Sequence, residues 1–439
     1  MRIPLLALVC LAATVAANGA PAASKSDKSA SKVTYYKDAL PILQERCQGC
    51  HRPGEIAPMT FMTYKETRPW AKAIKTAVST RKMPPWSADP HVGKFSNDWS
   101  LTDKHVETLT AWVDGGAAEG NANEAPAPKT YVEGWNIGKP DFEIGLPEAF
   151  PIPATGVVDY QYVVIPSGLT EDKWVQAAEL RPTFRQAVHH VVVFIREKGS
   201  NWLPLAKPGV PYIPPSNQQF INTLGGGNSE VLTIYTPGMA PDIWTSGLAK
   251  LVPAGADLVF QLHYTPNGKA GADQSKLALI FAKEPVQRRV ITSAGIDFKL
   301  SIPPGEANYA STAKNPNYYD SELISFFPHM HVRGKSFEYK MVALDGTETP
   351  LLNVPRYDFN WQFSYRLDKP IPLPAGSRIL CNAVFDNSAN NVANPDPKAT
   401  VKWGEQTTEE MMIGFYDVSV SKEMTRKKFQ TPPARPKAE

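Results

Sequence analysis

The sequence predicts a multidomain protein in which a small all-α domain precedes two antiparallel β-sandwich domains of jelly-roll-like type. Apolar residues recur at helical spacing only near the start of the 439-residue chain, in 38–46 and 102–113. A polar, proline-rich stretch, 121–130, has no periodicity and is predicted to be a linker. Short runs of Val, Ile, Phe and Tyr then alternate with turn residues over about 300 positions, which is typical of sandwiches and too long for one core.

The chain begins with a predicted secretory signal peptide, 1–20. Arg2 supplies the positive start, 4–15 is apolar, and Ala17 or Ala20 offers a small residue for cleavage. The apolar run is too short to cross a membrane, and no later run approaches the roughly 20 apolar residues that a span needs. We therefore expect a periplasmic or secreted protein without a membrane span.

The remaining boundaries follow from composition and from the strand-like runs. Residues 21–31 are rich in Ala, Ser and Lys and are expected to form a disordered leader. The all-α domain is expected over 32–120, the first sandwich over 131–285 and the second over 286–422, with the break placed near 284–289. The basic, proline-containing end, 423–439, is predicted to be a flexible tail.

Charge and cysteine usage exclude several classes of function. The net charge of +3 gives no broad basic surface for nucleic acid. Of the four cysteines, Cys10 leaves with the signal peptide and Cys381 is expected to be a small buried side chain in a strand, so there is no disulfide framework. Nucleophile-elbow, phosphate-loop and dinucleotide-binding patterns do not occur in the sequence.

The strongest local motif is Cys47-Gln48-Gly49-Cys50-His51, a C-x-x-C-H haem attachment sequence. Its two thiols can add to the haem vinyl groups, and the adjacent histidine then lies under the iron. A zinc knuckle or a redox-active cysteine pair is the alternative. Export and the lack of a second cysteine pair favour the haem. We therefore predict one covalently attached haem c.

Met83 is the predicted sixth ligand of the haem iron, because the prolines after it hold it in an extended segment. Met59, Met62 and His91 remain alternatives. The segment 35–120 resembles small class I cytochromes c, which place a Met-Pro loop between the haem motif and a C-terminal helix like the one expected near 101–116. The resemblance implies a cytochrome c fold for this domain.

Histidines supply the second set of candidate ligands. His329 and His331 are two positions apart and would share one face of a strand. His189 and His190 are adjacent, so both can reach one site only at a bulge, a kink or a strand end. His263 alone would more often be a core residue. Imidazole is the commonest metal ligand, and a thioether nearby would favour copper.

From about 144 to 418 the chain resembles the copper type II ascorbate-dependent monooxygenases, the family of the peptidylglycine alpha-hydroxylating and dopamine beta-monooxygenases. The matching stretches occur in the family's order: His189-His190, the Q-x-H-Y histidine His263, the H-x-H pair His329 and His331, and Met411 after Glu410. The resemblance implies two copper ions in two sandwiches facing each other across a cleft.

The resemblance also assigns roles to these ligands. The electron-transfer copper would be held by His189, His190 and His263, with Gln261 as an orienting neighbour. The copper that binds dioxygen would be held by His329, His331 and Met411, with Met412 as an alternative to Met411.

The chain departs from the family where substrate would bind. Phe327 replaces the arginine that grips the carboxylate of peptide substrates, and Ile413 and Phe415 replace polar residues. We therefore expect a small, apolar organic substrate in a cleft lined by these three side chains. Arg333, Trp361, Tyr365 and Asn387 are further candidates for this lining, although each could equally be structural.

The predicted function is hydroxylation of a C–H bond of this small organic substrate with dioxygen. The electrons would come through the haem from an ascorbate-like or protein donor outside the chain. Two alternatives are a non-catalytic haem and copper electron-transfer protein and a copper-binding module.

Overall fold

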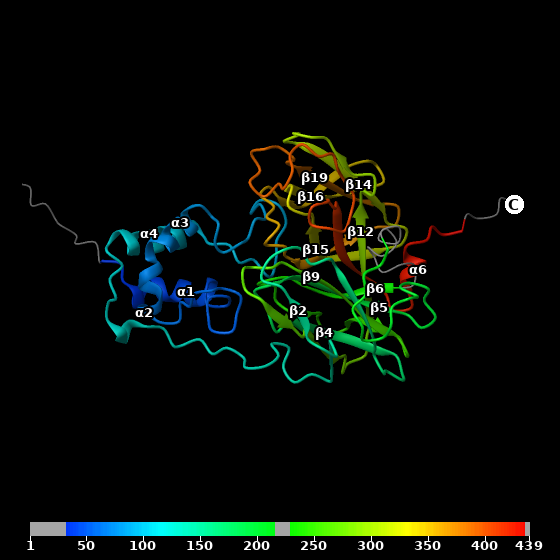
Figure 1. Cartoon of the computed structure of the whole chain (residues 1–439), viewed down its shortest axis with the longest axis horizontal. Coiled ribbons are helices and arrows are strands. Elements are labelled where there is room, and N and C mark those ends of the chain that lie inside the picture. Colours follow the sequence, from blue (N-terminus) through cyan, green and yellow to red (C-terminus); the bar gives the residue numbers. More distant parts are fainter. Residues whose placement is uncertain (1–31, 216–228, 435–439) are drawn as a thin grey trace, which may run out of the picture.

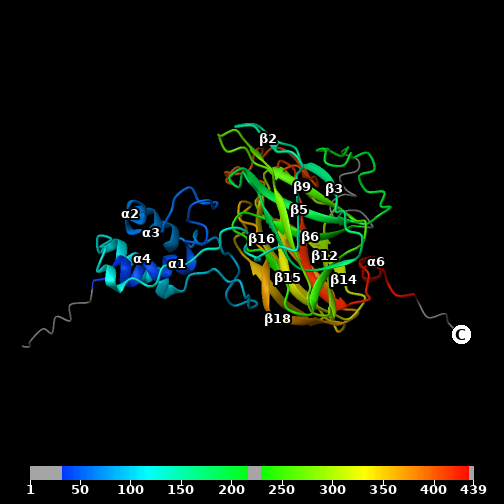
Figure 2. The ribbon, with the colours of Figure 1, turned by 90° about the horizontal axis from the view of Figure 1, so that it is seen from below.

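The computed structural model describes residues 32–215 and 229–434, so the predicted signal peptide and leader lie outside the described residues. Figures 1 and 2 show the N-terminal helices at one end of the molecule and the strands gathered in a larger body at the other. Strand accounts for 35% and helix for 12% of the protein. Within the described residues, no helix is long and apolar enough to cross a membrane.

The N-terminal region consists of short helices joined by long irregular segments. Its helical elements are η1 (Tyr35–Ala39), α1 (Leu40–Arg46), α2 (Tyr64–Thr67), η2 (Arg68–Trp70), α3 (Ala71–Ser79), α4 (Asp103–Asp114) and η3 (Ala122–Glu124). Helix α4 begins after Thr102, whose side chain accepts a hydrogen bond from the His105 amide. A small core around Tyr35, Leu43 and Trp112 holds these helices together.

The predicted fold class is wrong in its first part, because the region 32–120 is not a sizeable all-α domain and the protein is mostly β. Prolines at 53, 58, 84, 85 and 90 keep the segments 47–63 and 80–102 from continuing as helices. The middle of the second segment also packs away from the helices. Trp86 is buried in the core of a β-sandwich instead.

The main strands form one long sheet and two four-stranded sheets. Each four-stranded sheet packs against one half of the long sheet. Strands of the first half are β1 (Phe142–Gly145), β2 (Phe150–Ile152), β3 (Gln161–Pro166), β4 (Lys173–Arg181), β5 (Val188–Arg196), β6 (Ser229–Tyr235), β7 (Asp242–Ile243), β8 (Leu248–Val252), β9 (Asp257–Tyr264), β10 (Gly271–Asp273) and β11 (Lys276–Phe281). Strands of the second half are β12 (Arg288–Ile296), β13 (Ser301–Ile302), β14 (Tyr309–Pro316), β15 (Ser321–His329), β16 (Gly334–Val342), β17 (Glu348–Val354), β18 (Tyr365–Leu373), β19 (Arg378–Phe385), β20 (Val401–Lys402) and β21 (Ile413–Ser421).

The long sheet runs through both sandwiches in the order β1-β11-β4-β8-β12-β21-β15-β18, with β7 paired to β4. The sheet β3-β9-β5-β6 faces its first half and the sheet β14-β19-β16-β17 faces its second half, while β2 pairs with β10 and β13 with β20. The halves meet where β12 pairs in parallel with β8, Arg288 opposite Leu248. The expected break near 284–289 is therefore where the chain enters a strand of a shared sheet.

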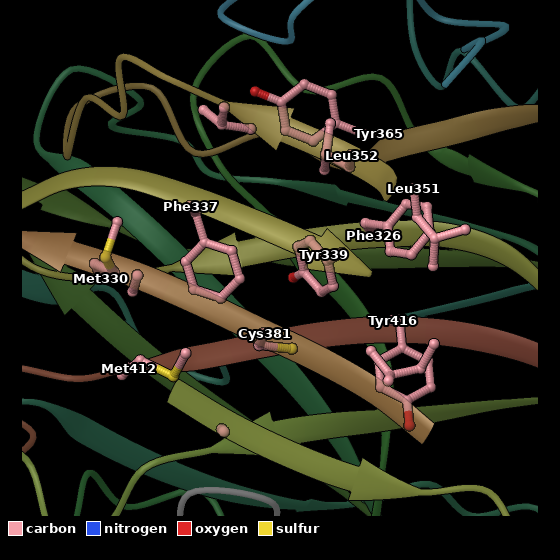
Figure 3. Packing of buried hydrophobic residues seen from close by; sticks show 14 of the residues in the cluster. Phe326, Met330, Phe337, Tyr339, Leu351, Leu352, Tyr365, Cys381, Met412 and Tyr416 are labelled. Atoms are coloured by element: carbon pink, nitrogen blue, oxygen red, sulfur yellow. The ribbon is translucent and has the colours of Figure 1, made fainter. Parts of the chain in front are cut away.

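Two large apolar cores fill the space between the sheets. Figure 3 shows part of the second core, in which Met330, Cys381 and Met412 lie among aromatic side chains. A Cβ at Gly414 would lie 2.5 Å from the Cys381 sulfur, so the glycine makes room for this buried thiol. Cys381 is thus the small buried side chain that the sequence suggests.

Part of the predicted tail packs on the body. The short helix α6 (Arg426–Phe429) buries Phe429, and the Arg426 side chain donates a hydrogen bond to the Ser229 carbonyl. Helix α6 is accordingly anchored to both halves of the β body, through Phe429 in the core of the second sandwich and through Arg426 to Ser229 in the first half.

Candidate metal centre and haem cavity

His189, His190 and His263 converge at one end of the sheet that contains β5 and β9. His190 lies opposite His263 across the two strands, and the register shifts between Val188 and His190. This irregularity lets adjacent histidines reach the same site. The Nδ1 atoms of His189 and His190 are 3.2 Å apart, and those of His190 and His263 are 3.4 Å apart. Nitrogens bound to one tetrahedral metal ion lie at about 3.3 Å from each other, so the spacing suits a shared ion.

The Nε2 atoms of two of these rings, those of His189 and His263, have hydrogen-bond partners. His189 Nε2 donates to the Phe359 carbonyl at 3.1 Å, and His263 Nε2 lies 2.9 Å from the Thr407 hydroxyl. Each contact fixes the ring so that Nδ1 is turned toward the other histidines. Burial lowers the pKa of His189 to about 3 and the pKa values of His190 and His263 well below the usual range. The rings are therefore neutral near pH 7, as metal ligands must be.

His329 ends β15 and His331 follows in the next loop. His329 Nδ1 donates to the Gln362 amide oxygen at 2.6 Å, and His331 Nδ1 donates to the Glu409 carbonyl at 3.1 Å. The Nε2 atom of His331 is buried without a hydrogen-bond partner. An unpartnered buried nitrogen on a ring held in one tautomer is typical of a metal ligand.

Glu410 holds the backbone of this loop. Its two carboxyl oxygens accept hydrogen bonds from the amides of His331 at 2.8 Å and Arg333 at 2.6 Å. Burial raises the pKa of Glu410 to about 8, and the two amide donors oppose that rise. Glu410 precedes Met411 in the chain and its carboxyl group binds the His331 amide. It therefore holds the two predicted ligands His331 and Met411 in a fixed relation to each other.

Met411 and Met412 point into different surroundings. Met411 packs with Phe327, Ile413 and Phe415 and lines a small cavity together with His190 and His329. Met412 is fully buried in the core of the second sandwich (Figure 3), and it does not line the cavity that contains His190 and His329. Of the two thioethers, only that of Met411 borders the histidine cluster.

The structure places all five histidines in one contiguous cluster. The ring centroids of His190 and His329 are 5.5 Å apart, and those of His329 and His331 are 5.3 Å apart. The two ligand sets therefore adjoin each other, and the open cleft that the resemblance implies between them is closed. Phe359 stacks on His189 at 4.1 Å and covers the cluster from one side.

The expected apolar substrate cleft is also too small. Phe327, Ile413 and Phe415 are buried around a cavity of about 30 Å³, which holds a few water molecules at most. A larger cavity of about 770 Å³ reaches His263 from the opposite side. Its walls include Arg356, Tyr357, Phe359 and Trp361, so aromatic and cationic side chains line it.

Several other residues singled out in the sequence have structural roles. Arg333 is buried and bonds the side chain of Asn387 at 2.9 Å, while Tyr365 packs on Trp86. Gln261 donates to the Tyr162 hydroxyl at 2.5 Å and forms no hydrogen bond with a histidine ring of the described residues.

Cys47, Cys50, His51 and Met83 line one apolar cavity of about 430 Å³, here called the candidate haem cavity, whose wall also includes Trp361 and Phe363 of the β body. Met59 also lines it, whereas Met62 and His91 do not. Burial raises the pKa values of Cys47 and Cys50 to about 12 and about 11, so both thiols are protonated, and the His51 ring stacks on Phe61 at 4.3 Å. Apolar walls with two thiols and an imidazole suit a covalently attached haem.

Sequence reasoning missed the loop residues that orient the histidines. Gln362, Phe359 and Glu410 come from irregular segments, and spacing alone does not show that a loop will reach a distant strand. The one available signal was composition. The run Phe359-Asn360-Trp361-Gln362-Phe363 alternates aromatic and amide side chains, as expected for an extended segment between two environments.

Comparisons with known proteins do not identify a relative. No family model matches the chain, and no curated protein matches it. Among solved structures, the major capsid protein P2 of bacteriophage PM2 is similar with a TM-score of 0.28 and 9% identity, over 64% of this chain and 98% of that one. The infectious bursal disease virus VP2 subviral particle gives a TM-score of 0.18 at 10% identity, over 66% and 75% of the two chains. Likeness at this level carries no argument about function.

Proposed function

We propose that the protein is a copper-dependent monooxygenase that hydroxylates a C–H bond of a small organic substrate and receives electrons through a covalently attached haem. The observation that carries the proposal is the cluster of five neutral, buried histidines. Three Nδ1 atoms in it converge, and His331 presents an unpartnered Nε2. Imidazole sites with one thioether favour copper over harder metals.

Each of the two ligand sets would bind one copper ion. His189, His190 and His263 would hold one copper ion, and His329, His331 and Met411 would hold the second. Copper in such sites supplies one-electron redox chemistry and activation of dioxygen. Hydroxylation consumes one dioxygen, two electrons and two protons for each alcohol and water formed. A donor outside the chain, an ascorbate-like molecule or a redox protein, supplies the electrons.

Residues around the predicted ligands orient the histidine rings by hydrogen bonds. The Phe359 and Glu409 carbonyls and the Gln362 amide fix the tautomers of His189, His331 and His329. Cys47 and Cys50 would form the thioether bonds to the haem, and His51 and Met83 would ligate its iron. The cavity of about 770 Å³ beside His263 has room for a small organic substrate.

A second candidate is a non-catalytic electron-transfer protein. It is favoured by the contact between His190 and His329 and by the absence of substrate-sized space beside Met411, where the cavity is about 30 Å³. A relay benefits from closed sites, whereas an oxygenase needs a free position for dioxygen.

The test uses the purified, metal-loaded protein. Metal analysis and EPR of the oxidised form should find two coppers and one low-spin haem. Oxygen uptake by the reduced protein, with product analysis across small organic substrates, should show an alcohol for each dioxygen consumed. Uptake without product would favour the relay, copper without any uptake would favour a binding module, and zinc in the histidine cluster would overturn the proposal.

A further inference from the structure

The loop between β17 and β18 lies between the haem cavity and the histidine cluster. Residues 361–364 belong to no helix or strand, and their side chains contact two different sites. Trp361 and Phe363 line the cavity that contains Cys47, Cys50 and His51. Their rings stack in parallel, with centroids 6.3 Å apart and an interplanar angle of 11°.

The haem side of this loop is in close contact with the haem attachment motif. A Cβ placed on Gly238 would lie 3.6 Å from Phe363 and 3.7 Å from the Cys50 sulfur. The glycine thus allows both groups to approach the same point. A haem attached to Cys50 would occupy the cavity that Phe363 lines.

The opposite side of the loop contacts both ligand sets through one buried amide. Gln362 Oε1 accepts the hydrogen bond from His329 Nδ1 at 2.6 Å, and Gln362 Nε2 donates to the Phe359 carbonyl at 3.2 Å. That same carbonyl accepts from His189 Nε2. The Gln362 carbonyl is in turn fixed by the hydroxyl of Thr236. A single side chain therefore joins His329 to His189 and lies next to the residues that line the haem cavity.

The haem cavity is held at a fixed position relative to this loop. The segment that follows Met83 pairs with β17 and β18: the Asp89 amide donates to Asn353 at 2.8 Å, and the Ser96 amide donates to Arg366 at 2.9 Å. Asn97 bonds the backbone of both Ser364 and Arg366. Backbone pairing of this kind is not consistent with a haem region that swings freely on a linker.

We propose that the loop Phe359–Phe363 is the electron bridge between the haem and the copper sites, with Gln362 as the positioning residue that couples it to both ligand sets. This inference rests on the proposed function. In the transfer step one electron leaves the ferrous haem, which becomes ferric, and one cupric ion becomes cuprous. Electron tunnelling weakens steeply across gaps between atoms, and this loop replaces such a gap with covalent and hydrogen bonds.

The test measures electron transfer and not turnover. The oxidised, copper-loaded protein is mixed without oxygen with less than one equivalent of a reductant that reacts at the haem, and haem reoxidation is followed by absorbance and cupric loss by EPR. We expect Gln362→Met and Trp361→Leu each to slow haem reoxidation at least tenfold. Trp361 touches no histidine in the cluster, so its replacement should leave the copper EPR spectrum unchanged.

Two controls separate the bridge from stability and from the proposed function. Gln274→Met removes hydrogen bonds to the carbonyls of Leu146 and Pro147, which belong to neither site, and should leave the rate unchanged. Wild-type rates in Trp361→Leu and in a folded Gln362→Met would overturn the bridge while leaving the proposed function intact. If the wild-type haem does not reoxidise as cupric ion is lost, then haem delivery of electrons itself fails.

Discussion

The haem cavity and the histidine cluster differ in how far apart their ligands lie in the chain. Cys47, Cys50 and His51 fall within five consecutive positions, so a local backbone conformation builds most of the first site. The histidine cluster draws on residues from 189 to 331, supplied by two sandwiches. Its geometry depends on strand register and on loops that cross between the sheets. Damage to the first site should therefore stay local, and damage to the second should depend on the packing of the whole β body.

The largest expected effect tests the local character of the haem site. The double variant Cys47→Ser, Cys50→Ser should lose covalent haem completely, because both sulfurs that attach it are gone. Haem staining after denaturing electrophoresis measures this loss. Copper content should not change, since neither cysteine touches a histidine of the cluster. Loss of copper together with haem would show that the two sites are not independent.

The matched control is Cys381→Ala, which removes a thiol from the core of the second sandwich (Figure 3). It should retain haem and lower the free energy of unfolding by about 1 kcal/mol.

A second test concerns the segment that joins the two regions. Trp86 belongs to the N-terminal region but packs on Tyr365, with ring centroids 4.8 Å apart. Trp86→Ala should lower the free energy of unfolding by about 3 kcal/mol, as expected for removal of a buried aromatic side chain. Urea denaturation measures this change.

Trp70→Ala is the matched control for this test, because Trp70 is 41% exposed. It should cost less than about 1 kcal/mol. Equal losses in the two variants would contradict the view that Trp86 anchors the haem region to the β body.

A third test compares the two adjacent methionines. Met411→Leu should weaken cuprous binding at one site about tenfold, a change of about 1.4 kcal/mol, because it removes the thioether that borders His329. Competition with a colorimetric cuprous chelator measures the affinity. Met412→Leu changes only core packing and should leave the affinity unchanged, with a stability cost below about 1.5 kcal/mol. The reverse result would assign the ligand to Met412.

A fourth test concerns a buried carboxyl group at the junction of the sandwiches. Glu405 accepts a hydrogen bond from Tyr162 at 3.0 Å, and burial raises the pKa of this carboxyl to about 8. The folded protein then holds a proton that the unfolded chain releases near its ordinary pKa, so stability falls as pH rises from about 4.5 to 8. The slope is at most about 1.4 kcal/mol per pH unit, the limit for one proton.

Glu405→Gln should remove the contribution of this carboxyl from the pH profile of thermal unfolding, while Glu410, whose pKa is also raised to about 8, keeps part of the slope. Glu143→Gln, on the exposed side of β1, should leave the profile as it is in the wild-type protein. An unchanged slope in Glu405→Gln would place the titrating group elsewhere.

The sequence predicts the contiguous site better than the site whose ligands are dispersed along the chain. The C-x-x-C-H motif is contiguous, and its residues do line one cavity. The histidines were identifiable as candidates, but the register shift at Val188 that unites His189 with His190 depends on pairing with β9. Gln362 and Glu410 could not be found from periodicity, since both act from loops. The all-α prediction failed because the proline-rich segment 84–99 packs on a sandwich and not on its own helices.

The long sheet that passes from β8 to β12 has a thermodynamic consequence. Two sandwiches with separate sheets would unfold as separate calorimetric units. Here buried charges of the first half contact the second half: the Arg289 and Glu230 side chains form an ion pair at 2.7 Å, and the Lys250 ammonium group donates to Thr292 at 2.8 Å and lies 3.5 Å from the Asp417 carboxylate. Loss of either half exposes charged groups that the other half neutralises. The β body should therefore melt in one cooperative transition, with a calorimetric enthalpy that matches the van't Hoff value.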